Sequence, residues 1–336
     1  MRLASFIHEG VDRIGVEIDD DHVIDLTKAL TVTRAGSAPA DMLSLIRGGE
    51  TALSAVRTVL DLARATPSAV PRIPVKDIRW HPPVRRPGKI CGVAMNNSAA
   101  DARKVSAPDH PAFFMKPTTC LLGHNEPIVV RDHYGRLHPE PELAVIVGKT
   151  IKDYDPRDGD DAVFGYAVFD DLTGNDMRSQ DRVHYWALYP DPKNPDEVTR
   201  VEQHLSYTAR YKGTDGFGPF GPWLVTKDAV PDPHALDISC SIGGETLTED
   251  NTRYYTYTVP EVLAFISRFL TLEAGDVISM GTAFRASKKG GRPLHTGDLS
   301  RLDGPVEVTI SGLGTLSNPV ERMKGEALPD WRLKRA

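Results

Sequence analysis

The chain has 336 residues, of which 40% are hydrophobic and 26% are charged, and this balance is typical of a globular protein. Its net charge of −6 and its isoelectric point near 6.0 argue against nucleic acid or an anionic membrane surface as a partner. No apolar run approaches the roughly 18–20 residues that span a bilayer, and the N-terminus becomes charged too early for a signal peptide. Three cysteines without metal-ligand spacing, Cys91, Cys120 and Cys240, predict reduced thiols in a cytoplasmic protein.

The first 88 residues predict a small α/β domain followed by a linker. Short bursts of alternating apolar and polar residues predict three strands, over residues 2–8, 13–19 and 22–27. Two helices are predicted after them, over residues 42–47 and 51–65. Six prolines then lie between Pro67 and Pro87. We therefore predict an N-terminal domain over residues 1–75 and a proline-rich linker over residues 76–88.

Strands dominate the rest of the chain. Apolar runs predict them over residues 89–95, 112–117, 128–130, 142–148, 164–170, 222–226, 237–243, 276–281 and 306–312. One helix interrupts these strands, because Thr258 and Glu261 have the spacing of a capping box and precede an apolar stripe of Val262, Phe265, Ile266, Phe269 and Leu270. The pattern predicts an α+β fold with a mostly β core domain over residues 89–320 and a polar C-terminal tail over residues 321–336.

Three carboxylates stand at the ends of two neighbouring predicted strands. Glu140 and Glu142 open one strand, in "HPEPELAVIVGK", and share a face because strand residues alternate with a period of two. Asp171 follows the next strand, "FGYAVFD". Adjacent carboxylates repel unless a cation or a proton joins them, and hard oxygen ligands without histidine or cysteine favour Mg²⁺, Mn²⁺ or Ca²⁺. The alternative is that these acids are solvated strand ends.

Two further segments carry candidate ligand-binding groups. Lys212 lies in the rigid, glycine-rich "YKGTDGFGPFGPW", where an ammonium group beside a metal ion would stabilise a developing enolate. Gly281 and Thr282 follow a strand in "VISMGTAF" and offer a backbone amide and a hydroxyl to a ligand oxygen. On local evidence alone, a solvated lysine and a plain turn explain these segments equally well. No HExxH motif or phosphate-binding loop is present.

Several motifs in fixed order resemble the fumarylacetoacetate hydrolase family. They are "FFMKP", "EPELAVIVGK", "GYAVFDDLTGNDM", "KGTDGFGPFGPWLVTKD", "LTLEAGDVISMGT" and "GDLSRLDGPVEVTISGLGTLSNPV", and they cover roughly residues 85–318. The resemblance implies a mixed β-sandwich roll, a homodimer and a divalent metal ion, commonly Mg²⁺ or Mn²⁺, with Ca²⁺ also compatible with carboxylates. It implies metal ligands at Glu140, Glu142 and Asp171, a cleft lysine at Lys212, and a substrate contact at Gly281 and Thr282.

The chain departs from the family at the residues that activate water. Hydrolytic members carry a His–Glu pair after the first strand of this domain, but here Ala100 and Arg103 occupy those positions. In "DDLTGNDMR", Asn175 stands where the family has arginine, and Arg178, one helical turn away, is a candidate to supply the missing cation to the substrate. An insertion over residues 182–207 is rich in Tyr, Trp and Pro and suits either a lid or substrate wall or a dimer contact.

No replacement for the missing histidine is identified. His138 precedes the two glutamates on their strand, His184 lies in the insertion, His295 lies in a turn, and Asp101 adjoins Ala100. Each of these is a candidate base, and the sequence does not choose among them.

Three functions are therefore considered. The first is metal-dependent hydrolysis of a C–C bond in a small 1,3-dicarbonyl or acylpyruvate-type oxo acid, with Lys212 and Thr282 stabilising the enolate. The second is tautomerisation, decarboxylation or hydration of a 2-oxo acid, which needs an enolate but tolerates the loss of the His–Glu pair. The third is a non-catalytic protein that only binds metal and ligand.

Overall fold

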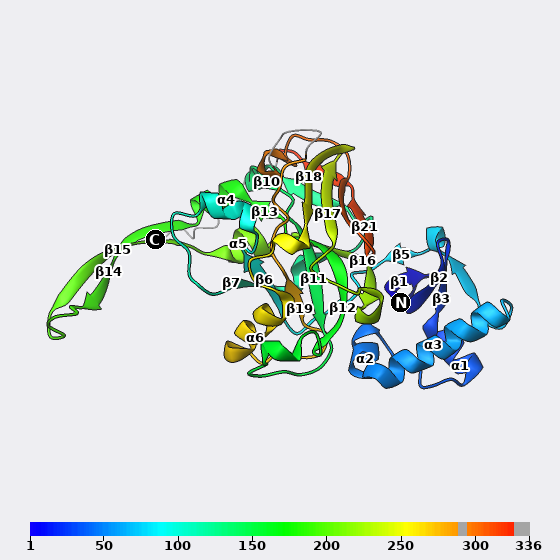
Figure 1. The fold of residues 1–336 in the computed structure, drawn as a ribbon. Coiled ribbons are helices and arrows are strands. Elements are labelled where there is room, and N and C mark those ends of the chain that lie inside the picture. The colour runs from blue at the N-terminus through cyan, green and yellow to red at the C-terminus, as the bar shows by residue number, and fades with distance from the viewer. Residues whose placement is uncertain (288–293, 326–336) are drawn as a thin grey trace, which may run out of the picture.

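The computed structural model describes residues 1–287 and 294–325, and it confirms the predicted α+β class. Strands predominate (Figure 1). The largest sheet is open and mixed, with the strand order β4-β3-β2-β1-β16-β12-β11-β19-β6-β7, while β5 pairs with β1 and β8 pairs with β16. Its strands are β1 (Arg2–His8), β2 (Val11–Asp19), β3 (His22–Asp25), β4 (Arg72–Pro74), β5 (Arg79–Trp80), β6 (Ile90–Ala94), β7 (Ala112–Lys116), β8 (Leu121–Leu122), β11 (Pro141–Val147), β12 (Val163–Asp170), β16 (Gly218–Thr226) and β19 (Val277–Ser279).

Smaller sheets and six helices of the described residues complete the fold. A four-stranded sheet has the order β18-β17-β20-β21, from β17 (Asp237–Ile242), β18 (Glu245–Asn251), β20 (Val306–Ile310) and β21 (Gly314–Asn318). Three two-stranded sheets pair β10 (Leu137–His138) with β13 (Thr173–Gly174), β14 (Arg182–Pro190) with β15 (Val198–Ser206), and β22 (Val320–Met323) with β9 (Ile128–Arg131). The helices are α1 (Leu26–Thr33), α2 (Met42–Arg47), α3 (Gly49–Ala65), α4 (Asn175–Gln180), α5 (Thr208–Gly213) and α6 (Val259–Phe269).

The N-terminal strands form the predicted meander, with one difference. Residues 22–27 were expected to be a single strand, but β3 ends at Asp25 and α1 begins at Leu26. The Asp25 carboxylate accepts a hydrogen bond from Lys28 N at 3.1 Å, and this N-cap starts the helix. β1 also pairs with β16 of the core, so the N-terminal strands extend the main sheet. The boundaries at residues 75 and 88 stay a prediction, and most of the predicted 321–336 tail (326–336) lies outside the described residues.

The central strand β11 is buried on both faces. Leu143, Val145 and Val147 pack in one hydrophobic cluster with residues of the four-stranded sheet and of α6, whereas Ala144 and Ile146 pack in a second cluster with α2 and α3. Successive strand residues point to opposite faces, so an uninterrupted apolar run is what a doubly covered strand requires. The capping box predicted at Thr258 and Glu261 is present at the start of α6.

Antiparallel pairing brings distant segments to one end of the main sheet. The first residue of β11, Pro141, pairs with the last residue of β12, Asp170. β19 pairs with β11 on its other side, with Ala144 opposite Ser279. The residues just before β11, just after β12 and just after β19 therefore meet at this end.

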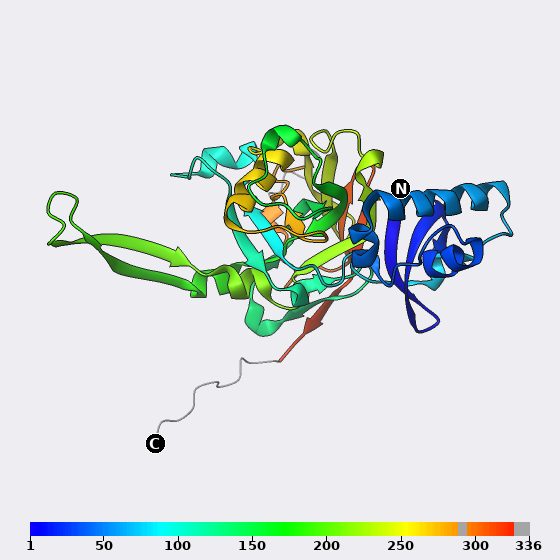
Figure 2. The same ribbon diagram turned by 90° about the horizontal axis from the view of Figure 1, so that it is seen from below.

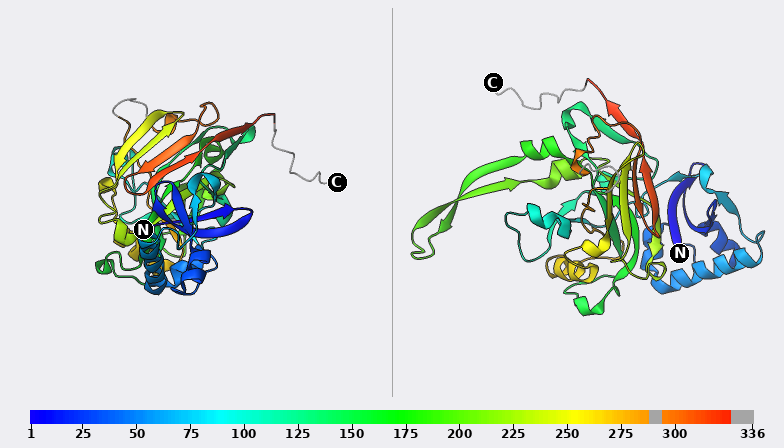
Figure 3. Two further views of the ribbon diagram at one scale, coloured as in Figure 1. Left: turned by 90° about the vertical axis from the view of Figure 1, so that its right-hand side faces the viewer. Right: turned by 45° about the horizontal axis from the view of Figure 1, so that its top comes forward.

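The insertion over residues 182–207 forms a two-stranded arm, β14–β15. Figures 1 and 3 show the arm extending away from the body, and Figure 2 shows it at the opposite end of the molecule from α3. Large apolar side chains on it are exposed, including Trp186, Leu188 and Tyr189. The distal part of the arm points away from the main sheet. Its base is joined in the chain to α4 on one side and to α5 on the other (Figure 1). The expected homodimer stays a prediction. None of the described helices has the length and apolar character needed to cross a membrane.

The buried Asn96 ties the loop after β6 to two other segments. Its Nδ2 donates to Tyr257 O at 3.0 Å and to Met280 O at 2.8 Å, and its Oδ1 accepts from Tyr257 N at 2.7 Å. Asn96→Ala leaves these buried backbone groups without partners, so we expect the free energy of unfolding to fall by about 3 kcal/mol. Chemical denaturation measures this change. Asn194→Ala, in the exposed turn of the arm, is the control and should change stability by less than ~0.5 kcal/mol; equal effects of the two substitutions would contradict the assignment.

Candidate metal centre and active site

The structure brings the three predicted carboxylates together. One oxygen from each of Glu140, Glu142 and Asp171 lies within 4.8 Å of the others. Glu142 and Asp171 are 2% and 1% exposed, so the alternative of solvated strand ends does not describe them. The backbone holds the arrangement, because Asp171 N donates to Glu140 O at 2.9 Å across the ends of the two strands.

Lys212 places a positive charge inside this group. From the end of α5, its Nζ donates to Glu140 Oε2 at 2.6 Å and to Asp171 Oδ2 at 2.5 Å. Burial alone would lower the pKa of Lys212, but the charges of Asp171 and Glu140 outweigh it and raise that pKa. Lys212 is therefore a permanently charged partner of two carboxylates and not a solvated surface lysine.

A second lysine, Lys116, was missed as a functional residue. Its fully buried Nζ donates to Asp171 Oδ1 at 2.5 Å, to Phe217 O at 3.0 Å and to Lys212 O. Each Asp171 carboxylate oxygen thus meets one ammonium group. The available signal was the position of Lys116 at the end of the apolar strand "AFFMK", since a lysine there is buried only when it is paired.

Glu142 is held by uncharged donors. Its Oε2 accepts from Ser279 Oγ at 2.5 Å and from Gly281 N at 2.9 Å, and its Oε1 accepts from Thr282 Oγ1 at 3.0 Å. Burial, with the nearby charge of Asp171, raises the pKa of Glu142 to about 8. The Gly281 amide, which the sequence predicted to contact a substrate, therefore donates to Glu142. Ser279 is a further site residue, and the sequence did not indicate it.

Gly281 is required by its backbone geometry. Its φ of +103° is a conformation that residues with a side chain rarely adopt, and an added Cβ would lie 2.8 Å from Asn96 Cβ. Thr282 follows in a position that bridges the two glutamates, because its Oγ1 also lies 3.1 Å from Glu140 Oε2.

His138 fixes the remaining oxygen of Glu140. Its Nε2 lies 3.1 Å from Glu140 Oε1, and its Nδ1 lies 2.7 Å from Asn175 Nδ2. Thr173 Oγ1 donates to the same Glu140 oxygen at 2.9 Å. Burial would raise the pKa of Glu140, but the charge of Lys212 and the His138 hydrogen bond lower it. Because Asn175 Nδ2 donates to Nδ1, the ring carries its proton on Nε2, and no nitrogen of His138 is left to act as a base.

Of the other candidate bases, Asp101 and His184 are paired with other residues, and His295 lines the cavity described below. Ala100 is buried in the turn over residues 98–103, and Arg103 stacks over the Phe284 ring at 4.5 Å. Asp101 forms an exposed ion pair with Lys104, at 2.7 Å. His184 lies on the arm and is hydrogen-bonded at 2.6 Å to Glu202. These groups do not replace the His–Glu pair of hydrolytic relatives.

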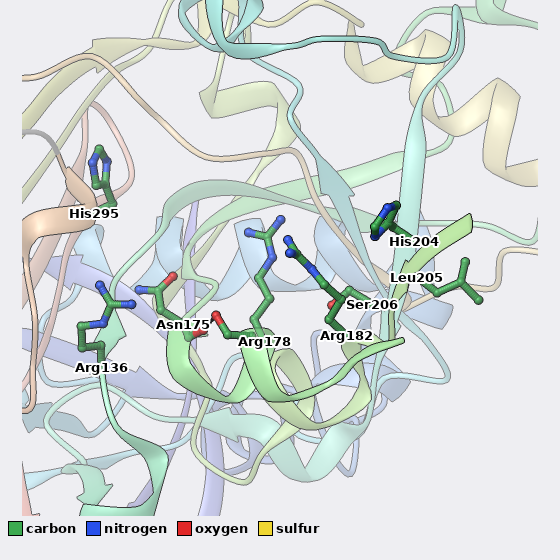
Figure 4. Close-up of a pocket in the computed structure, with 9 residues that line it drawn as sticks. Arg136, Asn175, Arg178, Arg182, His204, Leu205, Ser206 and His295 are labelled. Carbon is green, nitrogen blue, oxygen red and sulfur yellow. Dashed lines mark hydrogen bonds between the residues drawn. The ribbon is translucent and has the colours of Figure 1, made fainter. Parts of the chain in front are cut away.

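A cavity of about 400 Å³ lies at the start of α4, and its lining residue Asn175 is linked to Glu140 through His138. Its lining comes from the residue before β10, from α4, from the base of the arm and from the turn over residues 294–296 (Figure 4). The lining residues are Arg136, Asn175, Arg178, Ser179, Arg182, His204, Leu205, Ser206 and His295. The predicted substrate contacts Asn175 and Arg178 are therefore at the cavity, and His295 is on its opposite wall.

The donor set fits a hard divalent cation. Three carboxylates face the ammonium groups of Lys212 and Lys116, so full ionisation leaves one negative charge uncompensated, consistent with the raised pKa of Glu142. All three ligand groups are carboxylates, the donors preferred by Mg²⁺ and Mn²⁺. Which ion binds, and the ligand roles themselves, stay predictions.

Metal affinity is expected to depend on pH through Glu142. Its carboxyl group must lose a proton to coordinate a cation, and its pKa is raised to about 8, so affinity for Mn²⁺ should rise between pH 6 and pH 8 and then level. Calorimetry in buffers of different ionisation enthalpy measures the proton release. Glu142→Gln should remove the pH dependence and weaken binding, whereas a flat affinity of the unaltered protein over this range would contradict the assignment.

Comparisons with known proteins show the family to which the chain belongs. Residues 89–321 match the family model described as fumarylacetoacetate (FAA) hydrolase C-terminal. A mitochondrial oxaloacetate tautomerase, fahd2, from Xenopus laevis is 30% identical over 92% of this chain and 86% of its own. The oxaloacetate tautomerase YisK from Bacillus subtilis is 26% identical over 91% of this chain and 95% of its own.

A solved structure is similar over nearly the whole length. Maleylpyruvate hydrolase from Sphingobium sp. SYK-6, in complex with manganese (II) ion and pyruvate, superposes with a TM-score of 0.67 at 27% identity, and the match covers 96% of this chain and 99% of that one. Because the family model covers more than half of the sequence and the Xenopus relative is 30% identical over most of it, the chain belongs to the fumarylacetoacetate hydrolase family.

Proposed function

We propose that this protein is a metal-dependent enzyme that interconverts the keto and enol forms of a small 2-oxo acid. The observation that carries the proposal is the buried group of Glu140, Glu142 and Asp171 beside Lys212, combined with alanine and arginine at the positions of the water-activating pair. The site can stabilise an enolate, and Ala100 and Arg103 at the positions of the water-activating pair supply no base, while His295, of the described candidate bases, lines the cavity at the start of α4. Its relatives include oxaloacetate tautomerases, among them the Xenopus laevis and Bacillus subtilis proteins, and they support this interpretation.

The reaction moves one proton. Solvent water accepts a proton from C3 of the 2-oxo acid and returns one at the 2-oxygen, so no water is consumed overall and no C–C bond is broken, and the residues of the site stabilise the enolate between the two transfers. A divalent ion held by Glu140, Glu142 and Asp171 would supply a Lewis acid for the oxo oxygen. Thr282 and Lys212 stabilise the negative charge that develops on that oxygen, and His138 and Thr173 keep Glu140 oriented.

Hydrolysis of an acylpyruvate is the second candidate. The similar maleylpyruvate hydrolase holds Mn²⁺ and pyruvate, the kind of product that C–C cleavage of such a substrate releases. The two reactions share the enolate and differ in the attack of water. A protein that binds metal and ligand without turnover is the third possibility.

A product analysis separates these candidates. Protein with Mg²⁺ or Mn²⁺ is mixed with the enol form of oxaloacetate and, separately, with acylpyruvates, while ultraviolet absorbance follows the enol and NMR identifies products. We expect accelerated loss of the enol with the keto acid as the only product, and more than about 100-fold loss of this rate in Glu142→Gln. Glu321→Gln, on an exposed strand, is the matched control and should retain full activity. Acid fragments from acylpyruvates would establish hydrolysis, and no turnover would leave the binding protein.

Thr282 tests how the enolate is stabilised. Its hydroxyl lies between Glu140 and Glu142, so Thr282→Ala removes a group that orients both carboxylates of the enolate-stabilising site, and kcat should fall about 100-fold. Thr282→Ser retains the hydroxyl and should restore most of the rate. Steady-state kinetics on the enol measures both. A serine variant as slow as the alanine variant would show that the threonine methyl group, and not the hydroxyl, matters.

A further inference from the structure

Two histidines and a glutamate come together on one face of the arm, near the end that joins the body. His184 in β14 lies directly opposite His204 in β15, and Glu202 precedes His204 by two residues, so strand alternation places all three side chains on the same face. One ligating atom from each lies within 4.8 Å of the others. Among the described residues, this group and the carboxylate centre are the two sets of three histidine, cysteine or carboxylate side chains close enough to share an ion.

The ring nitrogens of the two histidines converge on one carboxylate oxygen. His184 Nε2 lies 2.6 Å from Glu202 Oε1, and His204 Nε2 lies 3.8 Å from the same atom. The two rings are stacked, with their centroids 4.1 Å apart and their planes inclined by 13°. Two protonated rings at this separation would repel each other, whereas two neutral rings can share a cation through their lone pairs. A single ion pair accounts for the first contact, and a bound cation accounts for the approach of both rings.

The donors of this group differ from those of the carboxylate centre. Two imidazole nitrogens and one carboxylate favour Zn²⁺ and similar transition-metal ions, whereas three carboxylates favour Mg²⁺ or Mn²⁺. The side chains of His184, Glu202 and His204 are 53%, 52% and 58% exposed, so an ion can reach them directly from water. Water can then complete the coordination shell that three protein ligands leave open.

The arm has a structural use for such an ion. A two-stranded ribbon is only marginally stable in water unless something else supports it. Large apolar side chains of the arm, among them Trp186, Leu188 and Tyr189, are exposed, so they do not form a core that holds the two strands together. An ion bound by one residue of β14 and two residues of β15 would cross-link the strands and favour the folded arm.

We propose that His184, Glu202 and His204 form a second metal site, which takes Zn²⁺ and fixes the two strands of the arm to each other. This arm site shares no residue with the carboxylate centre, and its ion supports structure instead of polarising an oxo acid. It is independent of the proposed function, because zinc binding by the arm requires no turnover of any substrate.

A zinc titration with matched variants tests the arm site. The full chain, with Mg²⁺ in excess to compete for the carboxylate centre, is titrated with ZnCl₂ in a calorimeter. We expect a single Zn²⁺ to bind at the arm, and roughly 100-fold weaker binding in His184→Gln and in His204→Gln, because each removes one of the protein ligands. Hydrogen exchange of the β14 and β15 amides should slow when Zn²⁺ is added to the unaltered protein, and it should not slow in either variant.

Two further substitutions serve as controls. His22→Gln removes the histidine of a solvent-accessible histidine–aspartate pair outside the arm, in which His22 Nδ1 lies 2.8 Å from Asp19 Oδ1. Arg200→Gln changes an exposed side chain of β15, two residues before Glu202 and on the same face. Both variants should keep the zinc affinity of the unaltered protein.

Three results would overturn the inference. Zinc affinity that survives in the His184→Gln/His204→Gln double variant would place the ion elsewhere in the protein. A complete lack of zinc binding by the unaltered chain would refute the site itself. Zinc binding that depends on the two histidines but leaves hydrogen exchange of the arm unchanged would contradict the cross-link between the strands.

Discussion

The gathering of three carboxylates, two of them buried and Glu140 partly buried, at one end of the main sheet is the constraint on which the rest of the site depends. Water does not solvate Glu142 or Asp171, so protein groups must compensate their charge. Lys116 and Lys212 each donate to one oxygen of Asp171, and Lys212 also donates to Glu140. Glu142 accepts hydrogen bonds only from neutral donors, and burial, with the nearby charge of Asp171, raises its pKa. A proton on Glu142 would cancel the one negative charge that Lys116 and Lys212 leave uncompensated, whereas a divalent cation would reverse the sign of that charge and interact with all three carboxylates.

The fold enforces this arrangement through backbone pairing. β11 is paired with β12 on one side and with β19 on the other, so register alone places Glu140 beside Asp171 and Gly281 beside Glu142. Both faces of β11 pack against hydrophobic clusters. A shift of the strand pairing by one residue would turn every β11 side chain toward the opposite cluster. The large hydrophobic core therefore keeps the three carboxylates close together although their negative charges repel one another.

The sequence predicts the part of the site that local pattern encodes. The i, i+2 spacing of Glu140 and Glu142 and the strand end at Asp171 offered convergence beside the alternative of solvated strand ends. Lys212, Gly281 and Thr282 were candidates from their own segments, and the resemblance favoured the functional interpretation of all six residues. Lys116 was not predicted, because its contact with Asp171 joins residues 55 apart. The function of His138 depends on a two-residue ladder with β13 that no periodicity marks. α1 was missed because Asp25 both ends a strand and caps a helix.

The loop that carries the missing pair explains why the chain retains its fold without it. Asn96 bonds to Tyr257 and Met280, while Asn97 caps the turn over residues 98–103 and donates to Asp250 Oδ2 at 2.8 Å. Both asparagines are buried, and their bonds hold the loop with alanine at position 100. The proposed loss of water activation is therefore compatible with an ordered loop. The proposed reaction, which moves only a proton, depends on the three carboxylates and on Lys116 and Lys212. The structure brings all five of these residues together.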